Sequence, residues 1–254
     1  MLKYLIQEIK KIINYIQEKI MSKKVLITGG NKGIGLAVSR AMLEFGYKII
    51  IVARDFDACP LLGVENVTCI EYDLSNVDGL QELAAEVGNI DILINNAGYM
   101  QPKYSYDNYP KEARDHIMNV DLYTPVELMN IFSVHMKKQK YGRIVNTASI
   151  AGQIGHPDVW YGMAKAALIN ATKIYGKLLG AHGITVNCVA PSPTETDMQK
   201  DNSEERKAEF KKTVATGRFA QAEEVAKAIV WLATDCPEYI NGICLDINNC
   251  SYPR

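Results

Sequence analysis

Short runs of apolar, mostly β-branched residues alternate with longer stretches of helical periodicity from Lys23 to the end of the chain. Such runs are typical of strands buried on both faces, and the helical stretches between them indicate βαβ units. The runs that predict strands are Val25–Thr28, Lys48–Ala53, Val67–Tyr72, Ile90–Asn95, Gly142–Thr147, Thr185–Val189 and Ile243–Ile247. The pattern predicts a single-domain, doubly wound α/β fold of about seven parallel strands flanked by helices.

The N-terminal segment has a different pattern. Apolar residues recur there at alternating spacings of four and three, at Leu2, Ile6, Ile9, Ile13, Ile16 and Ile20. This spacing predicts an amphipathic helical extension over residues 1–21, ahead of a main domain over residues 22–254. The helix would dock on its own domain or on an identical subunit. Two alternatives are a helix lying on a membrane surface and a segment that is disordered or not made, since Met21 could itself start the domain.

One long polar insertion interrupts the alternation, from Thr194 to Thr216. It falls between the end of a predicted strand and the last large helix. Charged segments of this length in compact domains often form lids over a site, and a solvated helix pair is the other interpretation.

The charge balance excludes several functional classes. The chain of 254 residues has 28 basic and 29 acidic side chains and a net charge of -1, which gives no sign of nucleic acid or of membrane contact. The cysteines form no C-x-x-C pair and the histidines share no metal-ligand spacing, so no metal site is expected. No stretch approaches the roughly 18 apolar residues of a membrane span. These features favour a cytoplasmic protein.

A glycine-rich turn follows the first predicted strand, and a predicted helix over Leu36–Phe45 follows the turn. Its candidate contacts with a pyrophosphate are Gly29, Asn31, Lys32, Gly33, Ile34 and Gly35. Glycines let backbone N–H groups approach a phosphate closely, and the N-terminus of the helix adds a positive dipole. A glycine cluster alone is weak evidence, but the order strand, turn, helix predicts a dinucleotide site.

The end of the second predicted strand indicates which dinucleotide is bound. An acidic residue there would accept hydrogen bonds from a free ribose 2′-hydroxyl, whereas this chain has Arg54. A guanidinium can pair with a 2′-phosphate, and Lys32 could add a second positive charge. Asp55 follows immediately and could neutralise Arg54. The residues therefore favour NADP(H) and leave NAD(H) as the alternative.

Three side chains are candidates for proton chemistry. Tyr161 and Lys165 are four residues apart in a predicted helix, so both project from one face. An ammonium near a phenol favours the phenolate and lowers the pKa of the phenol. Ser149 follows the fifth predicted strand and would deliver a hydroxyl to the carboxyl edge of the sheet, where ligands of such folds bind. It would orient a carbonyl while Tyr161 supplies the proton.

Taken together, these motifs resemble the short-chain dehydrogenase/reductase family over residues 23 to about 249. In the family's order, the chain has the glycine turn, Asn95-Asn96-Ala97-Gly98, Ser149, Tyr161 with Lys165, and Val189-Ala190-Pro191. The resemblance implies a Rossmann fold and a hydride transfer between a nicotinamide and a carbonyl carbon. It also implies that Tyr161 is the general acid or base, and that Lys165 binds the ribose. Asn119 resembles the residue that holds a proton-relay water near the lysine.

The resemblance implies further cofactor contacts at Asp73, Leu74, Asn95, Ala97, Gly98, Val189, Pro191 and Thr196. The expected pocket walls are Tyr99 to Tyr109, His156 to Trp160, and Thr194 to Thr216. The tyrosines of the first wall could equally pack beneath a surface loop. Ser192 departs from the family's usual glycine, and Asp246-Ile247-Asn248-Asn249 departs from its usual Asp-Gly-Gly. These departures put the substrate fit and the subunit contact in doubt.

The leading hypothesis is an NADP(H)-dependent oxidoreductase that interconverts a small carbonyl compound and its alcohol. The alternatives are an NAD-dependent alcohol or sugar dehydrogenase and a catalytically silent, nucleotide-bound scaffold. The expected partners are a small-molecule substrate and further copies of the chain, in a dimer or tetramer.

Overall fold

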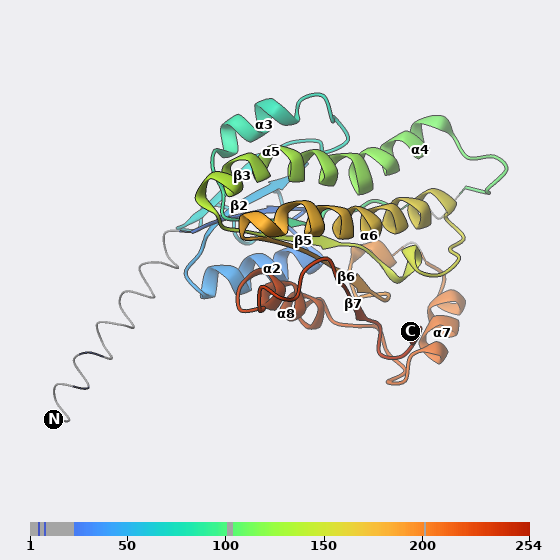
Figure 1. Ribbon diagram of the computed structural model, residues 1–254. Helices are drawn as coiled ribbons and strands as arrows, with labels where there is room; N and C mark the ends of the chain where they lie inside the picture. Colours follow the sequence, from blue (N-terminus) through green and yellow to red (C-terminus); the bar gives the residue numbers. More distant parts are fainter. Residues whose placement is uncertain (1–4, 6–7, 9–22, 101–103, 201) are drawn as a thin grey trace.

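The fold is a parallel sheet between two layers of helices (Figure 1). The computed structural model describes residues 5, 8, 23–100, 104–200 and 202–254. The strands are β1 Lys24–Thr28, β2 Lys48–Ala53, β3 Val67–Glu71, β4 Ile92–Asn95, β5 Gly142–Thr147, β6 Ile184–Pro191 and β7 Cys244–Ile247. This confirms the predicted doubly wound sheet. Apart from Leu5 and Glu8, the predicted helix over residues 1–21 lies outside the described residues.

The strand order places a crevice in the middle of the sheet. The seven strands lie in the order β3-β2-β1-β4-β5-β6-β7, and every pair is parallel. The chain moves outward from β1 to β3 and then returns to place β4 beside β1. The connections from β1 and β4 therefore leave in opposite directions, which opens the crevice where doubly wound folds bind ligands.

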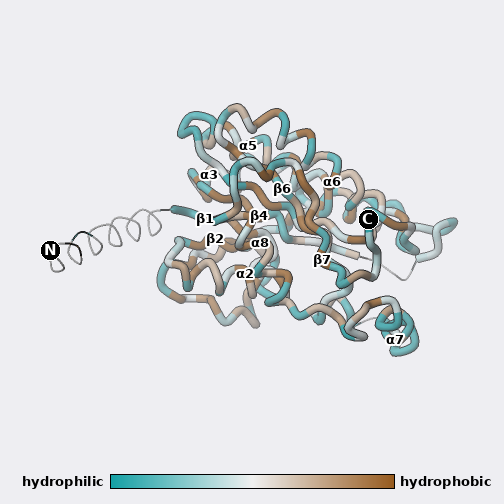
Figure 2. The backbone as a smooth tube through the Cα atoms, turned by 60° about the horizontal axis from the view of Figure 1, so that its bottom comes forward, coloured by the Kyte–Doolittle hydropathy of each residue, from teal (hydrophilic) through white to brown (hydrophobic). Residues whose placement is uncertain are grey.

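Both faces of the sheet are covered. Helices α2 Gly33–Glu44 and α8 Ala222–Ala233 lie on one face, and α3 Leu80–Val87, α5 Thr124–Gln139 and α6 Val159–Leu179 lie on the other (Figure 1). Successive side chains of β1 alternate between the two layers, since Val25 and Ile27 join one apolar cluster and Leu26 joins the other. Figure 2 shows hydrophobic residues concentrated along the central strands.

A π-helical turn joins two helices on the second face. Helix α4 Lys111–Met118 continues through the π-helical turn η1 Asn119–Tyr123 into α5. A π-helical turn carries an extra residue, so it changes which side chains face inward compared with a regular α-helix. Short 3₁₀ helices lie at η2 Ile150–Gly152, η3 Gly180–His182 and η4 Asp197–Gln199.

Helix boundaries differ from the expectation at the glycine turn. Helix α2 begins at Gly33, three residues before the predicted Leu36, because the second half of the turn is already the first helical turn. Its earliest N–H groups therefore lie within the turn itself. Helix α7 Glu204–Thr213 occupies the long insertion at the rim of the fold and is largely hydrophilic (Figure 2). Among the described residues, no helix is long and apolar enough to cross a membrane.

Candidate active site

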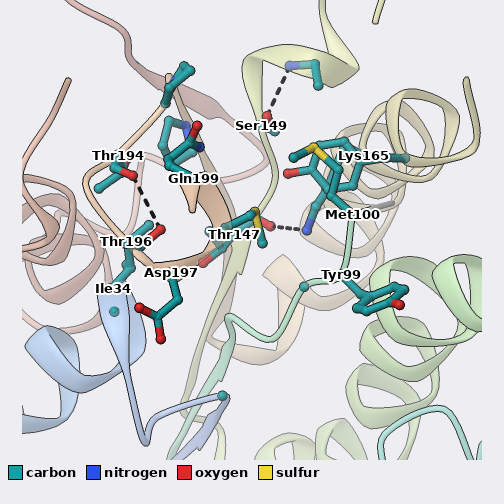
Figure 3. Close-up of a pocket in the computed structure, with 18 of the residues that line it drawn as sticks. Ile34, Tyr99, Met100, Thr147, Ser149, Lys165, Thr194, Thr196, Asp197 and Gln199 are labelled. Carbon is teal, nitrogen blue, oxygen red and sulfur yellow. Dashed lines mark hydrogen bonds between the residues drawn. The ribbon is translucent and has the colours of Figure 1, made fainter. Parts of the chain in front are cut away.

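A cavity of about 560 Å³ lies at the carboxyl ends of the strands. It collects side chains from the glycine turn, the ends of β2, β4 and β5, the start of α6, and the long insertion. Figure 3 shows part of this lining, with Thr147 and Ser149 from β5 and the residues after it, Lys165 from α6 and Thr196 from the insertion. The predicted site residues that line it are Gly29, Asn31, Lys32, Gly33, Ile34, Arg54, Asp73, Leu74, Ala97, Gly98, Ser149, Tyr161, Lys165, Pro191 and Thr196. The fold therefore brings together residues that are far apart along the chain.

The glycine turn is fixed against β4. Gly29 has a φ of 64°, and a Cβ atom there would lie 3.0 Å from the Ala97 Cα atom. The Asn96 side-chain amide donates to the Thr28 and Gly29 carbonyls at 3.1 and 3.2 Å. At the N-terminus of α2, no side chain caps the helix. Its first N–H groups are thus left for an anion, and the turn has the shape and polarity that suit a pyrophosphate.

The end of β2 carries an exposed cation at the cavity. Arg54 lines the cavity, and within the described part of the chain it forms no ion pair with Asp55. The Asp55 carbonyl instead accepts a hydrogen bond from the Asn31 amide at 2.9 Å, which ties the two loops together. The possibility that Asp55 neutralises Arg54 through a direct ion pair is thereby removed.

Tyr161 is positioned by the N-cap of its own helix. The buried Asp158 side chain accepts a hydrogen bond from the Tyr161 backbone N–H at 3.2 Å and another from the Tyr109 hydroxyl at 3.1 Å. A capping aspartate before a helix is a recognisable sequence signal, and sequence reasoning missed it here. The Tyr161 ring packs against the His156 ring, with the two ring centres 5.5 Å apart. The phenol lies at the cavity beside Ser149.

Lys165 is held rigidly on the same face of α6. Its Nζ atom donates to the Thr147 carbonyl at 2.8 Å, as Figure 3 shows, and lies 2.9 Å from an Asp121 carboxylate oxygen. Both charged side chains are buried, with exposed fractions of 3% and 0%. The same Nζ atom lies 5.7 Å from the centre of the Tyr161 ring. An ammonium has three protons, so one remains free for the cavity.

Asn119 does not take the position expected of it. Its amide donates to the Ser75 carbonyl at 2.9 Å, and it is absent from the residues that line the cavity. The residue that meets Lys165 is Asp121, two positions further along the π-helical turn. Two residues span about half a turn of helix, so these side chains point to opposite sides. The sequence signal that could have identified Asp121 is its charge between two apolar residues, Val120 and Leu122.

We therefore expect Asn119→Ala to leave turnover within about threefold of the wild type. Its lost hydrogen bond to Ser75 should lower the free energy of unfolding by about 1 kcal/mol. Steady-state kinetics and urea unfolding of the variant measure the two effects. A loss of turnover of a hundredfold or more would return Asn119 to the catalytic machinery.

Asn95 is also placed away from the cavity. It is 2% exposed, and its amide donates to the Asn146 side chain at 2.9 Å and to the Pro125 carbonyl at 3.3 Å. Asn146 in turn donates to Thr172 at 3.0 Å. This network joins β4, β5 and α6, so Asn95 stabilises the packing around the strands and, contrary to the expected cofactor contact, does not line the cavity. Its neighbour Asn96 faces the cavity instead.

The electrostatics of Tyr161 differ from the expectation. Burial raises the pKa of the phenol above its ordinary value of 10.0, Lys165 lowers it, and Asp121 raises it again. For Lys165, burial opposes the ammonium, but Asp121 and Tyr161 outweigh this and raise its pKa. The simple scheme of one ammonium acting on one phenol is therefore incomplete.

Some residues of the predicted pocket walls line the cavity, and others do not. Tyr99 and His156 line the cavity, whereas Tyr104 and Tyr109 stack edge to face with ring centres 5.3 Å apart. Trp160 does not line it and lies beneath the Arg114 guanidinium. The insertion lines one side through residues that include Met198, Gln199, Asn202, Arg206 and Phe210. The insertion therefore forms one wall of the cavity.

Comparison with known proteins relates this geometry to a family. Residues 29–249 match the family model described as enoyl-(acyl carrier protein) reductase. The chain is 32% identical over 245 residues to a 3-oxoacyl-(acyl-carrier-protein) reductase of Haemophilus influenzae, with 92% of this chain and 99% of that protein covered. The Escherichia coli protein of the same name is 32% identical over 242 residues, covering 91% and 97% of the two chains.

Solved structures show the same fold. A 4-hydroxyisoleucine dehydrogenase superposes with a TM-score of 0.86 at 24% identity, covering 91% of this chain and 99% of that one. A gluconate 5-dehydrogenase from Burkholderia cenocepacia, solved with NADP and tartrate, has a TM-score of 0.81 at 26% identity and covers 90% and 94%. With the family model matching residues 29–249 of the 254-residue chain, the chain belongs to the short-chain dehydrogenase/reductase family of oxidoreductases.

Proposed function

We propose that this protein is an NADP(H)-dependent oxidoreductase that interconverts a carbonyl compound and its alcohol. The observation that carries the proposal is that the glycine turn, Ser149, Tyr161 and Lys165 all border one cavity. A nicotinamide dinucleotide would supply or accept the hydride. The glycine turn would hold its pyrophosphate, and the free proton of Lys165 would serve its ribose.

The protein's own task is to place the carbonyl and move one proton. Ser149 would donate from its hydroxyl to the carbonyl oxygen, and its oxygen accepts a hydrogen bond from the Ala151 N–H at 3.1 Å. Tyr161 gives its proton to the same oxygen in reduction and removes it in oxidation. The rigid anchoring of Lys165 keeps the groups aligned, which is where an enzyme of this kind gains much of its rate.

Arg54 and Lys32 support the choice of NADP(H). Both are exposed at the cavity rim near the glycine turn, and the described residues place no ion pair on either. A guanidinium there matches a 2′-phosphate and offers nothing specific to a free 2′-hydroxyl.

Arg54→Asp should shift the ratio of kcat/KM for NADPH over NADH by about a hundredfold or more toward NADH. The carboxylate would repel a 2′-phosphate and accept a hydrogen bond from a 2′-hydroxyl. Kinetics with both cofactors measure the ratio. Arg40→Asp, which makes the same change of charge on the outer surface of α2, is the matched control and should leave it unchanged. An unaltered ratio in Arg54→Asp would argue for NAD(H).

A carbonyl screen tests the activity itself. Loss of NADPH absorbance is followed with 3-oxoacyl thioesters, small ketones, aldehydes and sugars. The thioesters come first because the curated relatives at 32% identity are 3-oxoacyl-(acyl-carrier-protein) reductases. Failure of every compound in both directions, with the dinucleotide bound, would favour the silent scaffold.

A hydroxy or oxo acid is the second candidate substrate. Arg206 of α7 lines the cavity, its charge influences His156, and no described residue forms an ion pair with it. A guanidinium facing a substrate pocket suits a carboxylate. If acids are turned over and thioesters are not, this candidate replaces the first.

Three expectations from the sequence stay predictions. They are assembly as a dimer or tetramer, a cytoplasmic location, and a boundary between the N-terminal extension and the main domain after residue 21.

A further inference from the structure

The buried pair of Asp121 and Lys165 changes the charge beside the reacting phenol. One Asp121 oxygen lies 2.9 Å from the Lys165 Nζ atom, and the other accepts the Tyr99 backbone N–H at 3.0 Å. The carboxyl group is completely buried. Burial raises its pKa, while the ammonium and the N–H oppose that effect. The ionised carboxylate satisfies both partners, so we treat the pair as charged at neutral pH.

The carboxylate cancels much of the effect that Lys165 has on Tyr161. An isolated ammonium near a phenol stabilises the phenolate, whereas an ion pair presents nearly no net charge. The Tyr161 ring is buried, with an exposed fraction of 7%, so solvent does little to stabilise a negative charge on its oxygen. Asp121 itself also disfavours the phenolate through its like charge.

Other groups facing the phenol do not restore a net positive charge. They are Asp158 at the N-cap of α6, His156 in the preceding loop, and the neutral Ser149 after β5. Burial lowers the pKa of His156 below its ordinary value, so this ring is neutral from neutral pH upward. On β6, a hydrogen bond with Cys244 and burial raise the pKa of Cys188, and that thiol stays neutral. From α4, Arg114 lies over Trp160 and His116 against Tyr99.

We propose that Asp121 is a positioning residue that neutralises Lys165, keeps Tyr161 protonated into alkaline solution, and thereby makes this a reductase site at neutral pH. This inference rests on the proposed function. In reduction, the phenol O–H bond breaks and its proton passes to the carbonyl oxygen as hydride from the reduced dinucleotide joins the carbon. The tyrosinate then recovers a proton from solvent. Oxidation needs the tyrosinate first, and so it needs alkaline pH.

A titration of Tyr161 tests the inference without any substrate. The ultraviolet absorbance of tyrosinate is followed in the full-length chain and in Tyr161→Phe between about pH 7 and 11, and the difference isolates Tyr161. In the wild type we expect no ionisation of Tyr161 below its ordinary value of 10.0. The same comparison in an Asp121→Asn background should give a pKa of Tyr161 that is lower by about one unit or more. This corresponds to a tenfold or larger increase in the ionisation constant.

Asp121→Asn suits this test because an amide oxygen can still accept the Tyr99 N–H while the charge is removed. Asp115→Asn is the matched control: it removes a half-exposed carboxylate on α4 that pairs with Lys111 and Arg114. The control should leave the Tyr161 titration in place. An equal titration in Asp121→Asn and the wild type would overturn the inference. Should the buried substitution prevent folding, the wild type decides alone, since ionisation near neutrality would also overturn it.

Kinetics provide the second readout. With any alcohol that the screen identifies, the oxidation kcat/KM of the wild type should rise until well above neutral pH, and Asp121→Asn should reach its plateau at least one unit earlier. The reduction rate of the variant should begin to fall at the same lower pH. If no carbonyl is turned over, the proposed function fails, and the tyrosinate titration still judges the role of Asp121 separately.

Discussion

Tyr161→Phe is expected to lower kcat/KM for carbonyl reduction about a thousandfold, which corresponds to about 4 kcal/mol of lost transition-state stabilisation. The variant removes the phenol that lies at the cavity beside Ser149 and Lys165. It retains the ring, which packs with Ile117, Ala151 and Ala164, so the fold should be unaffected. Single-turnover and steady-state loss of NADPH absorbance measure the effect.

The matched control for this substitution lies on the same helix. Tyr175 is on α6, and its hydroxyl donates to the Asn130 side chain, away from the cavity. Tyr175→Phe should retain wild-type turnover. If Tyr161→Phe keeps more than about a tenth of the activity while dinucleotide binding is unchanged, another group supplies the proton, and the acid–base assignment is wrong.

Gly35→Ala is expected to produce the largest loss of stability. A Cβ atom at this position would lie 2.0 Å from the Gly29 carbonyl oxygen and 2.5 Å from the Asn96 amide nitrogen. The first contact is with backbone that sits in the glycine turn, so neither atom can move without opening the turn. Overpacking of this kind costs about 3 kcal/mol, and the loss of the turn's shape should weaken dinucleotide binding as well.

Urea unfolding and dinucleotide titration measure these two consequences. Gly155→Ala is the control for stability, because a Cβ atom at Gly155 would meet nothing within 4 Å. We expect that variant to unfold within about 0.5 kcal/mol of the wild type. A Gly35→Ala protein as stable as the Gly155→Ala protein would show that the turn is less tightly packed than described, and the argument for the pyrophosphate site would weaken with it.

The two corrections in the site share one cause. Asn119 and Asn95 each have a second polar residue within two positions, Asp121 and Asn96 respectively, and only one member of each couple lines or serves the cavity. Their order along the chain says that the region is polar, but not which side chain faces inward. For Asn119 the outcome depends on the π-helical turn, which rotates the residues that follow it.

The long insertion shows the same limit in another form. Its composition was compatible with either a lid or a solvated helix pair, and the structure uses it to line the cavity with α7 and the 3₁₀ helix before it. Which side chains of such a segment face a site depends on how the segment packs. Here Phe210 packs against Phe219, and the backbone N–H groups of Ala215 and Thr216 donate to Asn249. The hydrogen bonds to Asn249 join residues that are distant along the chain.

Local patterns were enough for the strands, the glycine turn and the spacing of Tyr161 and Lys165. Each of these depends on periodicity or on neighbours within a few residues, which the amino-acid order states directly. Packing between α6, the π-helical turn and β5 decides three other features. These are which residue pairs with Lys165, the inward orientation of the Asn95 side chain, and the net charge near the Tyr161 phenol. Such orientations are set by contacts across the fold, because buried charges and amides take whichever direction completes their hydrogen bonds.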